Sequence, residues 1–271
     1  MMARPTGAAQ AVGVVGVVTR GTTNPNRLRR VDSWIAGRFD GLLRGADDPL
    51  VVDLGYGERP VTTVELYRRL ATIRADVRVV GLEIDPARVA AAAGAASPPA
   101  LEFRRGGFEL AGLRPLLVRA MNVLRQYDES DVDGAWATMI AALAPGGAVV
   151  EGTCDELGRL ASWVTLDATG PRSLTLAANL STLDDPATLA QRLPKALIHR
   201  NIPGERVHDL LGALAEAWRT AAAYAPFGPR QRWRRAVATL RGTGWPVLDR
   251  PARTRLGELT VAWCAVAPAG R

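Results

Sequence analysis

Acidic and glycine residues end two short apolar runs near the start of the chain. Asp53 lies in the first run, Gly55 and Gly57 follow it directly, and Glu83 ends the second run. Glycine permits a sharp turn and the close approach of a ligand, because it has no side chain. A carboxylate at the tip of the second strand accepts the hydroxyls of a ribose. The spacing therefore predicts a nucleotide-binding crevice at the carboxyl ends of parallel strands.

Proline replaces the third glycine that a dinucleotide-binding loop carries. Pro60 stands at that position, which argues against a pyrophosphate packed on the following helix. Asp53 would repel a pyrophosphate and suits a cationic ligand instead. A nicotinamide cofactor thus stays open only as an alternative.

Residues 50–155 resemble the class I S-adenosylmethionine-dependent methyltransferases. The motifs that carry the resemblance lie, in chain order, at residues 53–57, 83–88, 105–110, 122–124 and 143–147. The resemblance implies S-adenosylmethionine as cofactor and S-adenosylhomocysteine as product. It also implies cofactor contacts at Asp53, Gly55, Tyr56, Gly57, Glu83, Ile84, Gly107, Phe108 and Asn122. Phe108 would either stack on the adenine or belong to the core, and Arg59 is a candidate partner of the methionine carboxylate.

Methyl transfer from a sulfonium requires an aligned nucleophile, and a base only if that nucleophile carries a proton. The candidate catalytic residues are Asn122, Tyr127 and His199, with Arg125 and Asp128 also placed near the methyl group. His199 opens a polar segment that is either a substrate-facing loop or a solvated surface. The chain lacks the Asn-Pro-Pro-Tyr motif of amino-group methylation and the Pro-Cys nucleophile of cytosine methylation. We expect no metal site.

Alternating strands and helices position these residues. Apolar runs at 50–54, 77–84, 101–103, 116–120 and 148–151, with helical patterns between them, predict an α/β fold. Residues 161–166 and 173–178 predict a hairpin, and 259–266 predict a last strand. With the resemblance, we expect a doubly wound, mostly parallel, seven-stranded sheet of the Rossmann-like methyltransferase type.

The chain divides into a lead and a larger domain. An amphipathic helix at about 28–39 places residues 1–45 in an N-terminal helical lead. This lead either folds over the cofactor or caps the core with Trp34 and Phe39. Residues 46–271 are expected to form the methyltransferase domain, with a helical addition at about 184–245 before the last strand.

The composition narrows the class of protein. A length of 271 residues suits one large globular domain. The hydrophobic content of 48%, with a formal charge of only +7, excludes a disordered chain. All but one of the 34 basic residues are arginine, and they are scattered, which favours compositional bias over nucleic-acid binding. Residues 230–235, where arginines flank Trp233, keep an RNA methyltransferase open as an alternative.

The remaining features concern partners and compartment. Cys154 and Cys264 have no metal-binding or disulfide-framework spacing. The longest apolar run near the start, residues 11–18, is too short to span a bilayer. We therefore expect a cytoplasmic enzyme with a small-molecule acceptor and no membrane partner. A non-catalytic protein that retains the fold is the other alternative.

Overall fold

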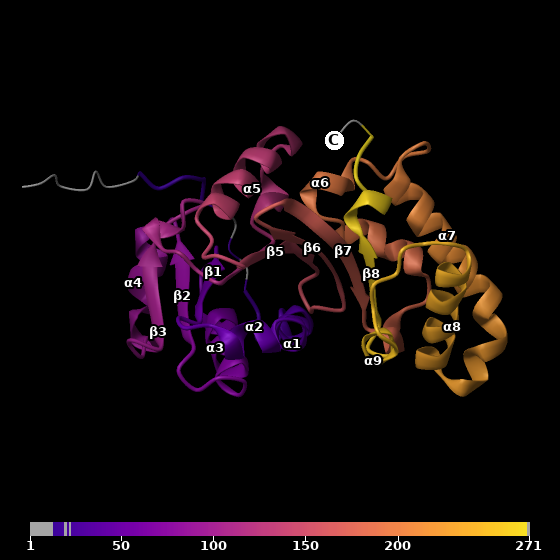
Figure 1. Ribbon diagram of the computed structural model, residues 1–271, viewed down its shortest axis with the longest axis horizontal. Helices are drawn as coiled ribbons and strands as arrows, with labels where there is room; N and C mark the ends of the chain where they lie inside the picture. Colours follow the sequence, from indigo (N-terminus) through magenta and orange to yellow (C-terminus); the bar gives the residue numbers. More distant parts are fainter. Residues whose placement is uncertain (1–12, 19–20, 22, 270–271) are drawn as a thin grey trace, which may run out of the picture.

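An eight-stranded sheet runs through the molecule. The computed structural model describes residues 13–18, 21 and 23–269. The strand order is β3-β2-β1-β4-β5-β6-β7-β8, and Figure 1 shows it from β3 at the left to β8 at the right. The strands are β1 (Leu50–Leu54), β2 (Arg78–Glu83), β3 (Leu101–Arg105), β4 (Leu117–Met121), β5 (Ala148–Cys154), β6 (Leu160–Asp167), β7 (Gly170–Ala178) and β8 (Glu258–Ala262).

The two halves of the sheet differ in strand direction. Strands β1 to β5 pair in parallel, in the order of a doubly wound sheet. Strands β5 to β8 form an antiparallel meander. The expected α/β class with a mostly parallel sheet is confirmed, and so is the hairpin, which is β6 and β7. The sheet has eight strands rather than seven, and β8 ends at Ala262 because Trp263–Ala265 form a 3-10 turn.

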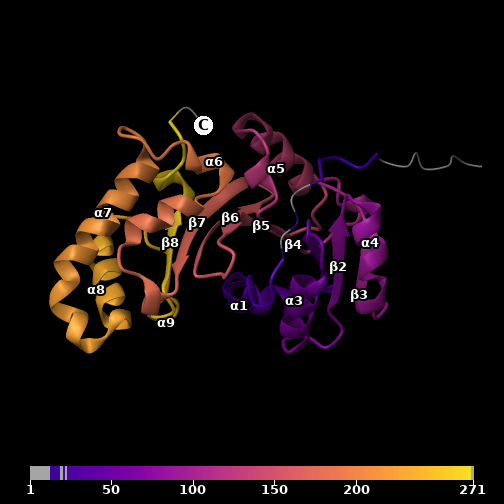
Figure 2. The same ribbon diagram turned by 180° about the vertical axis from the view of Figure 1, so that it is seen from behind.

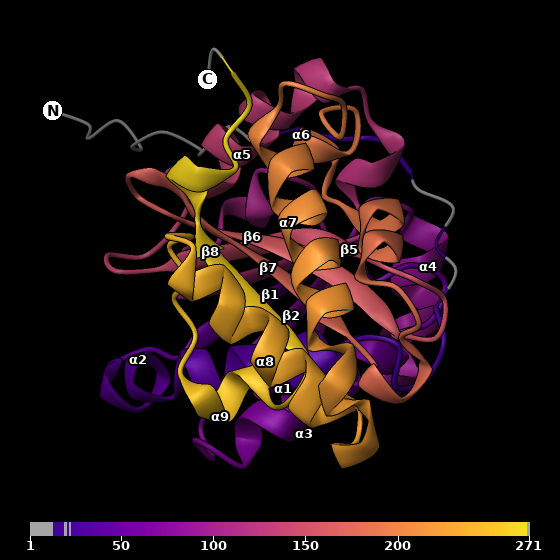
Figure 3. The same ribbon diagram turned by 90° about the vertical axis from the view of Figure 1, so that its right-hand side faces the viewer.

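Helices cover both faces of this sheet. They are α1 (Arg29–Arg38), α2 (Asp40–Gly45), α3 (Val61–Ala71), α4 (Pro86–Ala92), α5 (Val132–Ala141), α6 (Lys195–Ile198), α7 (Arg206–Thr220), α8 (Pro229–Gly242) and α9 (Pro251–Thr254). Figures 1 and 2 show α5 on one side of the sheet and α1 and α3 on the other. In Figure 3, α7 and α8 lie over β6, β7 and β8.

Helices α1, α2 and α3 bury their apolar sides against the parallel half of the sheet. Trp34, Leu43 and Leu66 belong to one core with Val51 and Val79. This packing follows from sequence, because side chains two residues apart in a strand point to the same face. Residues 29–45 of the lead therefore form a helical layer on the sheet. Residues 1–12, 19, 20 and 22 of the lead lie outside the described residues.

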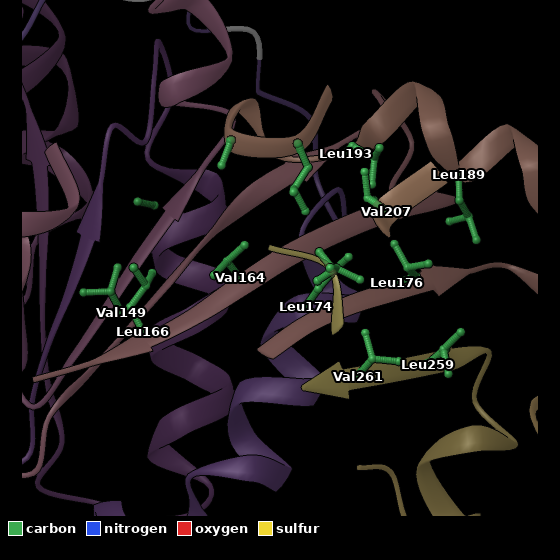
Figure 4. Close-up of a cluster of buried hydrophobic side chains, with 14 of the residues drawn as sticks. Val149, Val164, Leu166, Leu174, Leu176, Leu189, Leu193, Val207, Leu259 and Val261 are labelled. Carbon is green, nitrogen blue, oxygen red and sulfur yellow. The ribbon is translucent and has the colours of Figure 1, made fainter. Parts of the chain in front are cut away.

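The second core includes buried residues of both halves of the sheet, which pack with α5 and with the helical addition. In Figure 4, Val164 and Leu174 of the sheet point toward the same core as Leu193 and Val207. Burial of this apolar surface fixes the addition to the sheet. In the part of the chain that the structure describes, no helix has both the length and the apolar composition to cross a membrane.

One carboxyl group is buried within β5. Glu151 has no exposed surface, and neither of its carboxyl oxygens has a hydrogen-bond partner among the described residues. Burial raises the pKa of Glu151 to about 8. Glu151 is therefore mostly protonated at neutral pH.

Candidate active site

The glycine loop after β1 has the backbone conformation for which glycine is suited. Gly55 and Gly57 have φ values of +70° and +85°, in the left-handed region. The Gly55 amide donates to the Leu82 carbonyl over 2.8 Å, which fixes the loop beside β2. A Cβ atom on Gly57 would lie 2.5 Å from the carbonyl oxygen of Gly21. Both glycines are thus required by the turn, and Gly57 also by the segment packed on it.

Glu83 lies against this loop at the end of β2. Its side chain is buried, its Oε2 accepts from the Gly57 amide over 3.0 Å, and its Oε1 accepts from the Ile84 amide over 2.9 Å. The Arg88 guanidinium lies 3.6 Å from Oε1. A third amide, that of Asp85, donates to Oε1 over 3.5 Å. A carboxylate offers about four acceptor positions, so these three amides leave capacity for about one further donor. The predicted pairing of the glycine loop with Glu83 is therefore present in the fold.

A small cavity lies beside Glu83, at the ends of β2 and β3. Its lining includes Glu83, Ile84, Gly107, Phe108 and Tyr127, and its volume is about 10 Å³. Phe108 is buried, and its ring meets the Tyr127 ring edge to face at 5.3 Å. The structure thus gathers Phe108, the candidate for stacking on the adenine, with Glu83, the candidate for binding the ribose, around a space too small for an adenine.

The N-terminal segment, by which we mean the described residues between 13 and 23, closes this small cavity. Val15 and Val17 line it, and the Phe108 amide donates to the Val15 carbonyl over 2.9 Å. The Val17 amide donates to the Tyr127 hydroxyl over 2.6 Å. Further along, the Gly21 carbonyl accepts from the Glu58 amide over 2.9 Å. The N-terminal segment therefore lies across the crevice. The Val15 carbonyl is hydrogen-bonded to the Phe108 amide, so this amide is not free to bind a ligand at the edge of the crevice.

A larger cavity of about 550 Å³ lies on the other side of the glycine loop. It is bounded by the glycine loop, the N-terminal segment, the end of β4 and the loop after β5. Its lining residues are Gly21, Thr23, Arg27, Leu28, Asp53, Leu54, Gly55, Tyr56, Gly57, Thr62, Met121, Asn122, Arg125, Gln126, Glu156 and Arg192. The volume lies in the range of ordinary small-molecule sites.

Asp53 lines this cavity, but its charge is balanced inside the fold. Its carboxylate accepts from Arg119 at 2.8 and 2.6 Å and from the Thr63 hydroxyl at 2.6 Å. Arg119 is itself buried and also contacts the buried carboxylate of Asp32. The interpretation of Asp53 as the partner of a cationic ligand is therefore revised: its direct partner is Arg119.

Tyr56 and Asn122 are also held by neighbouring residues. The Tyr56 ring packs edge to face on Phe103 at 5.3 Å, and the Tyr56 carbonyl accepts from the Thr23 hydroxyl over 2.9 Å. Asn122 has a left-handed φ of +64°, and its Oδ1 accepts from the Cys154 amide over 2.9 Å. The Asn122 amide therefore joins the ends of β4 and β5 at the wall of the larger cavity.

Several other sequence candidates lie outside both cavities. His199 is exposed after α6, where its Nε2 lies 3.4 Å from Nζ of Lys195. Arg59 is exposed, and Asp128 takes part in a capping box with Asp131. Tyr127 lies at the small cavity and not at the larger one. Among the described residues, no three His, Cys, Asp or Glu side chains are placed to hold a metal ion.

Residues that sequence reasoning did not select complete the larger cavity. Arg27 donates to the carbonyls of Cys154 and Asp155, at 3.4 and 3.0 Å, and Arg192 reaches the cavity from the segment after β7. Arg27 ends a polar cluster at residues 20–27 of the lead, which the sequence predicts either to fold over the cofactor or to cap the core. Nothing in the local sequence marks Arg192, because it lies far along the chain from the glycine loop. Arg125, which the sequence did place near the site, lines the same cavity.

Comparison with known proteins gives alignments only with solved structures. No protein-family model matches the chain, and no curated protein matches its sequence. The magnesium protoporphyrin IX methyltransferase ChlM of Synechocystis PCC 6803, solved with S-adenosylhomocysteine, aligns with a TM-score of 0.37 and 18% identity over 48% of this chain and 55% of that one. A putative methyltransferase of Thermobifida fusca YX aligns with a TM-score of 0.36 and 19% identity, over 49% and 55%.

A third structure is the CcbJ methyltransferase of Streptomyces caelestis, with a TM-score of 0.34 and 19% identity over 56% of this chain and 65% of that one. The chain thus matches between about half and two thirds of the length of these three proteins. The function below is argued from the residues of this chain.

Proposed function

We propose that the chain is a class I S-adenosylmethionine-dependent methyltransferase with a small-molecule acceptor. The observation that carries the proposal is the contact of Glu83 with the Gly57 amide at the carboxyl edge of β1 and β2. Ligands of doubly wound sheets bind at this edge, outside the strand ends. Glu83 retains acceptor capacity for one ribose hydroxyl, and a second hydroxyl would replace its long contact with the Asp85 amide. The glycine loop leaves space for the rest of the cofactor.

The two cavities divide the cofactor between them. The adenine belongs in the small cavity beside Phe108, whose backbone amide donates to a ring nitrogen once Val15 leaves it. The methionine end belongs beyond Gly55 and Gly57, in the larger cavity. When bound, S-adenosylmethionine supplies an electrophilic methyl group on a sulfonium. The walls of the larger cavity orient the acceptor toward it and exclude water, which favours an in-line displacement.

The closed small cavity sets a condition on binding. Val15 and Val17 must move out of the small cavity before the adenine enters. Breaking their contacts costs free energy, and this cost weakens the observed affinity for the cofactor. These contacts include the hydrogen bonds to Phe108 and Tyr127. The N-terminal segment therefore acts as a competitor of the cofactor, at the edge of the site.

An RNA acceptor loses the observation that supported it. Trp233 is completely buried in α8, and its indole N–H donates to the Glu258 carbonyl over 3.2 Å. Arg232 lies over the Trp218 ring at 4.0 Å from its centroid, within the protein. Trp233 is therefore not available to stack on a base.

A non-catalytic protein that keeps the fold is the second candidate, favoured by the small volume of the closed cavity. Calorimetric titration with S-adenosylmethionine, S-adenosylhomocysteine and NAD decides between the alternatives. The proposal expects micromolar binding of the first two ligands and much weaker binding of NAD. Tight NAD binding alone would establish a nicotinamide enzyme, and binding of none of the three would favour the non-catalytic protein.

A further inference from the structure

The larger cavity contains more positive than negative charge. Three arginines, Arg27, Arg125 and Arg192, line it, against the carboxylates of Asp53 and Glu156. Asp53 forms a buried ion pair with Arg119, which also pairs with Asp32. The Glu156 side chain is 65% exposed, so water screens much of its attraction. An excess of positive charge therefore remains on the wall of the cavity.

Arg125 and Arg192 lie next to each other on this wall. The Arg125 Nη1 donates to the carbonyl of Gln191, the residue before Arg192, over 3.3 Å. Burial lowers the pKa of Arg125, and the nearby charge of Arg192 lowers it further, while the charge of Glu156 opposes the change. Among the described residues, no carboxylate lies within ion-pair distance of Arg125. Two like charges are thus held side by side at a cavity, an arrangement that an anion stabilises.

The fold holds Arg192 in place through its backbone. The hydroxyls of Thr153 in β5 and Ser162 in β6 both donate to the Arg192 carbonyl, and both residues are completely buried. The Arg192 side chain is 20% exposed, and its Nη2 lies 3.5 Å from the Glu156 carboxylate. Its buried Nε has no hydrogen-bond partner in the part of the chain that the structure describes. Arg192 therefore has one donor without a partner among the described residues, its buried Nε, and a backbone that the sheet holds in place.

We propose that the methyl acceptor carries an oxyanion, a carboxylate or phosphate group, which Arg125 and Arg192 bind together in the larger cavity. This inference rests on the proposed function and adds the substrate class to it. Guanidinium groups suit this task, because their planar donors match the oxygens of carboxylates and phosphates in pairs. The helical addition, through Arg192, thus supplies part of the acceptor site.

The test uses three aromatic probes on the full-length protein saturated with S-adenosylhomocysteine. Benzoate and phenyl phosphate carry the two oxyanions, and benzamide is the neutral counterpart of benzoate. Calorimetry should show binding of at least one anionic probe, and benzoate should bind about ten-fold or more tightly than benzamide if the carboxylate is the preferred group. If the phosphate is the preferred group, phenyl phosphate should instead bind about ten-fold or more tightly than benzamide. The tighter of the two anions identifies the group.

The variants Arg125→Gln and Arg192→Gln should each weaken the preferred anion about ten-fold or more and leave S-adenosylhomocysteine affinity within about three-fold. Arg192→Lys should weaken it less than Arg192→Gln, because it retains the charge. Arg172→Gln is the matched control, since Arg172 pairs with Asp167 on the exposed turn of the β6–β7 hairpin. It should bind every probe as the wild type does.

Three results would overturn the inference while leaving the proposed function intact. The first is competition between the anion and S-adenosylhomocysteine, which would show that the two arginines hold the methionine carboxylate. The second is an equal affinity for benzamide, benzoate and phenyl phosphate, or no detectable binding of any of the three probes. The third is unchanged anion affinity in both glutamine variants. Failure of the wild type to bind S-adenosylhomocysteine would instead remove the proposed function, and this inference with it.

Discussion

Replacement of the buried Glu151 by glutamine should stabilise the protein in a pH-dependent way. Burial raises the pKa of Glu151 from 4.5 to about 8 in the folded chain. Between these values the unfolded chain has lost a proton that the folded chain retains. The free energy of unfolding therefore falls as the pH rises through this window, by about 1.4 kcal/mol per pH unit, and levels off above about pH 8.

Glutamine has nearly the same shape and does not titrate, so Glu151→Gln removes this dependence. The variant and the wild type should be similarly stable at pH 5. At pH 8 the variant should be more stable by about 4 kcal/mol, which is the slope multiplied by the roughly three pH units between them. For a chain of this size the gain corresponds to an increase in Tm on the order of 10 °C.

Urea denaturation followed by tryptophan fluorescence at pH 5, 6, 7 and 8 measures the difference. Other buried acids, such as Asp32, titrate equally in both proteins, so their contributions cancel in the difference between the two free energies of unfolding. Glu216→Gln is the control, because the Glu216 side chain is 59% exposed on α7. It should follow the wild-type curve. A Glu151→Gln variant whose stability runs parallel to that of the wild type from pH 5 to 8 would show that Glu151 is ionised in the folded protein, and would refute the reasoning.

Three further predictions concern the closed crevice and the buried charges. Tyr127→Phe should raise cofactor affinity about five-fold in a calorimetric titration, because it removes the hydroxyl that accepts from the Val17 amide and weakens the competing segment; a loss of affinity would place that hydroxyl on the cofactor instead. Arg119→Met should destabilise the protein by about 3–5 kcal/mol in urea, because it leaves two buried carboxylates without their cation, and an unchanged midpoint would contradict this. Gly57→Ala should lower stability by about 1–3 kcal/mol, because alanine is strained at a φ of +85° and its Cβ meets the Gly21 carbonyl; a thermal melt that matches the wild type would oppose it.

Local sequence patterns predict the parallel half of the sheet well. Strand β1 has the bounds expected from its apolar run, because a run enclosed by turn residues and buried on both faces has few alternatives. The number of apolar runs in the sequence equals the number of observed strands. The expectation of seven strands depends on the family resemblance and not on these runs. The end of β8 was not predicted, since apolar residues continue through the 3-10 turn at Trp263–Ala265.

The site is predictable only as far as its residues follow consecutive strands. Gly55, Gly57 and Glu83 gather as expected, because parallel strands end at one edge. Asp53 has the expected position but a different partner, since the register of β1 with β4 places Arg119 beside it. Arg192 enters the cavity through tertiary packing of the helical addition, and no local pattern contains that information.

The interaction of Glu83 with the cofactor is the central claim of the account. Calorimetric titration of S-adenosylhomocysteine into the wild type, Glu83→Gln and the control Glu58→Gln tests it most directly, since Glu58 is exposed on the same loop. The account predicts micromolar binding by the wild type and the control, and a loss of about a hundred-fold in Glu83→Gln, because charge-assisted bonds to the ribose are lost. Equal affinity in all three proteins, or no binding by the wild type, would contradict it.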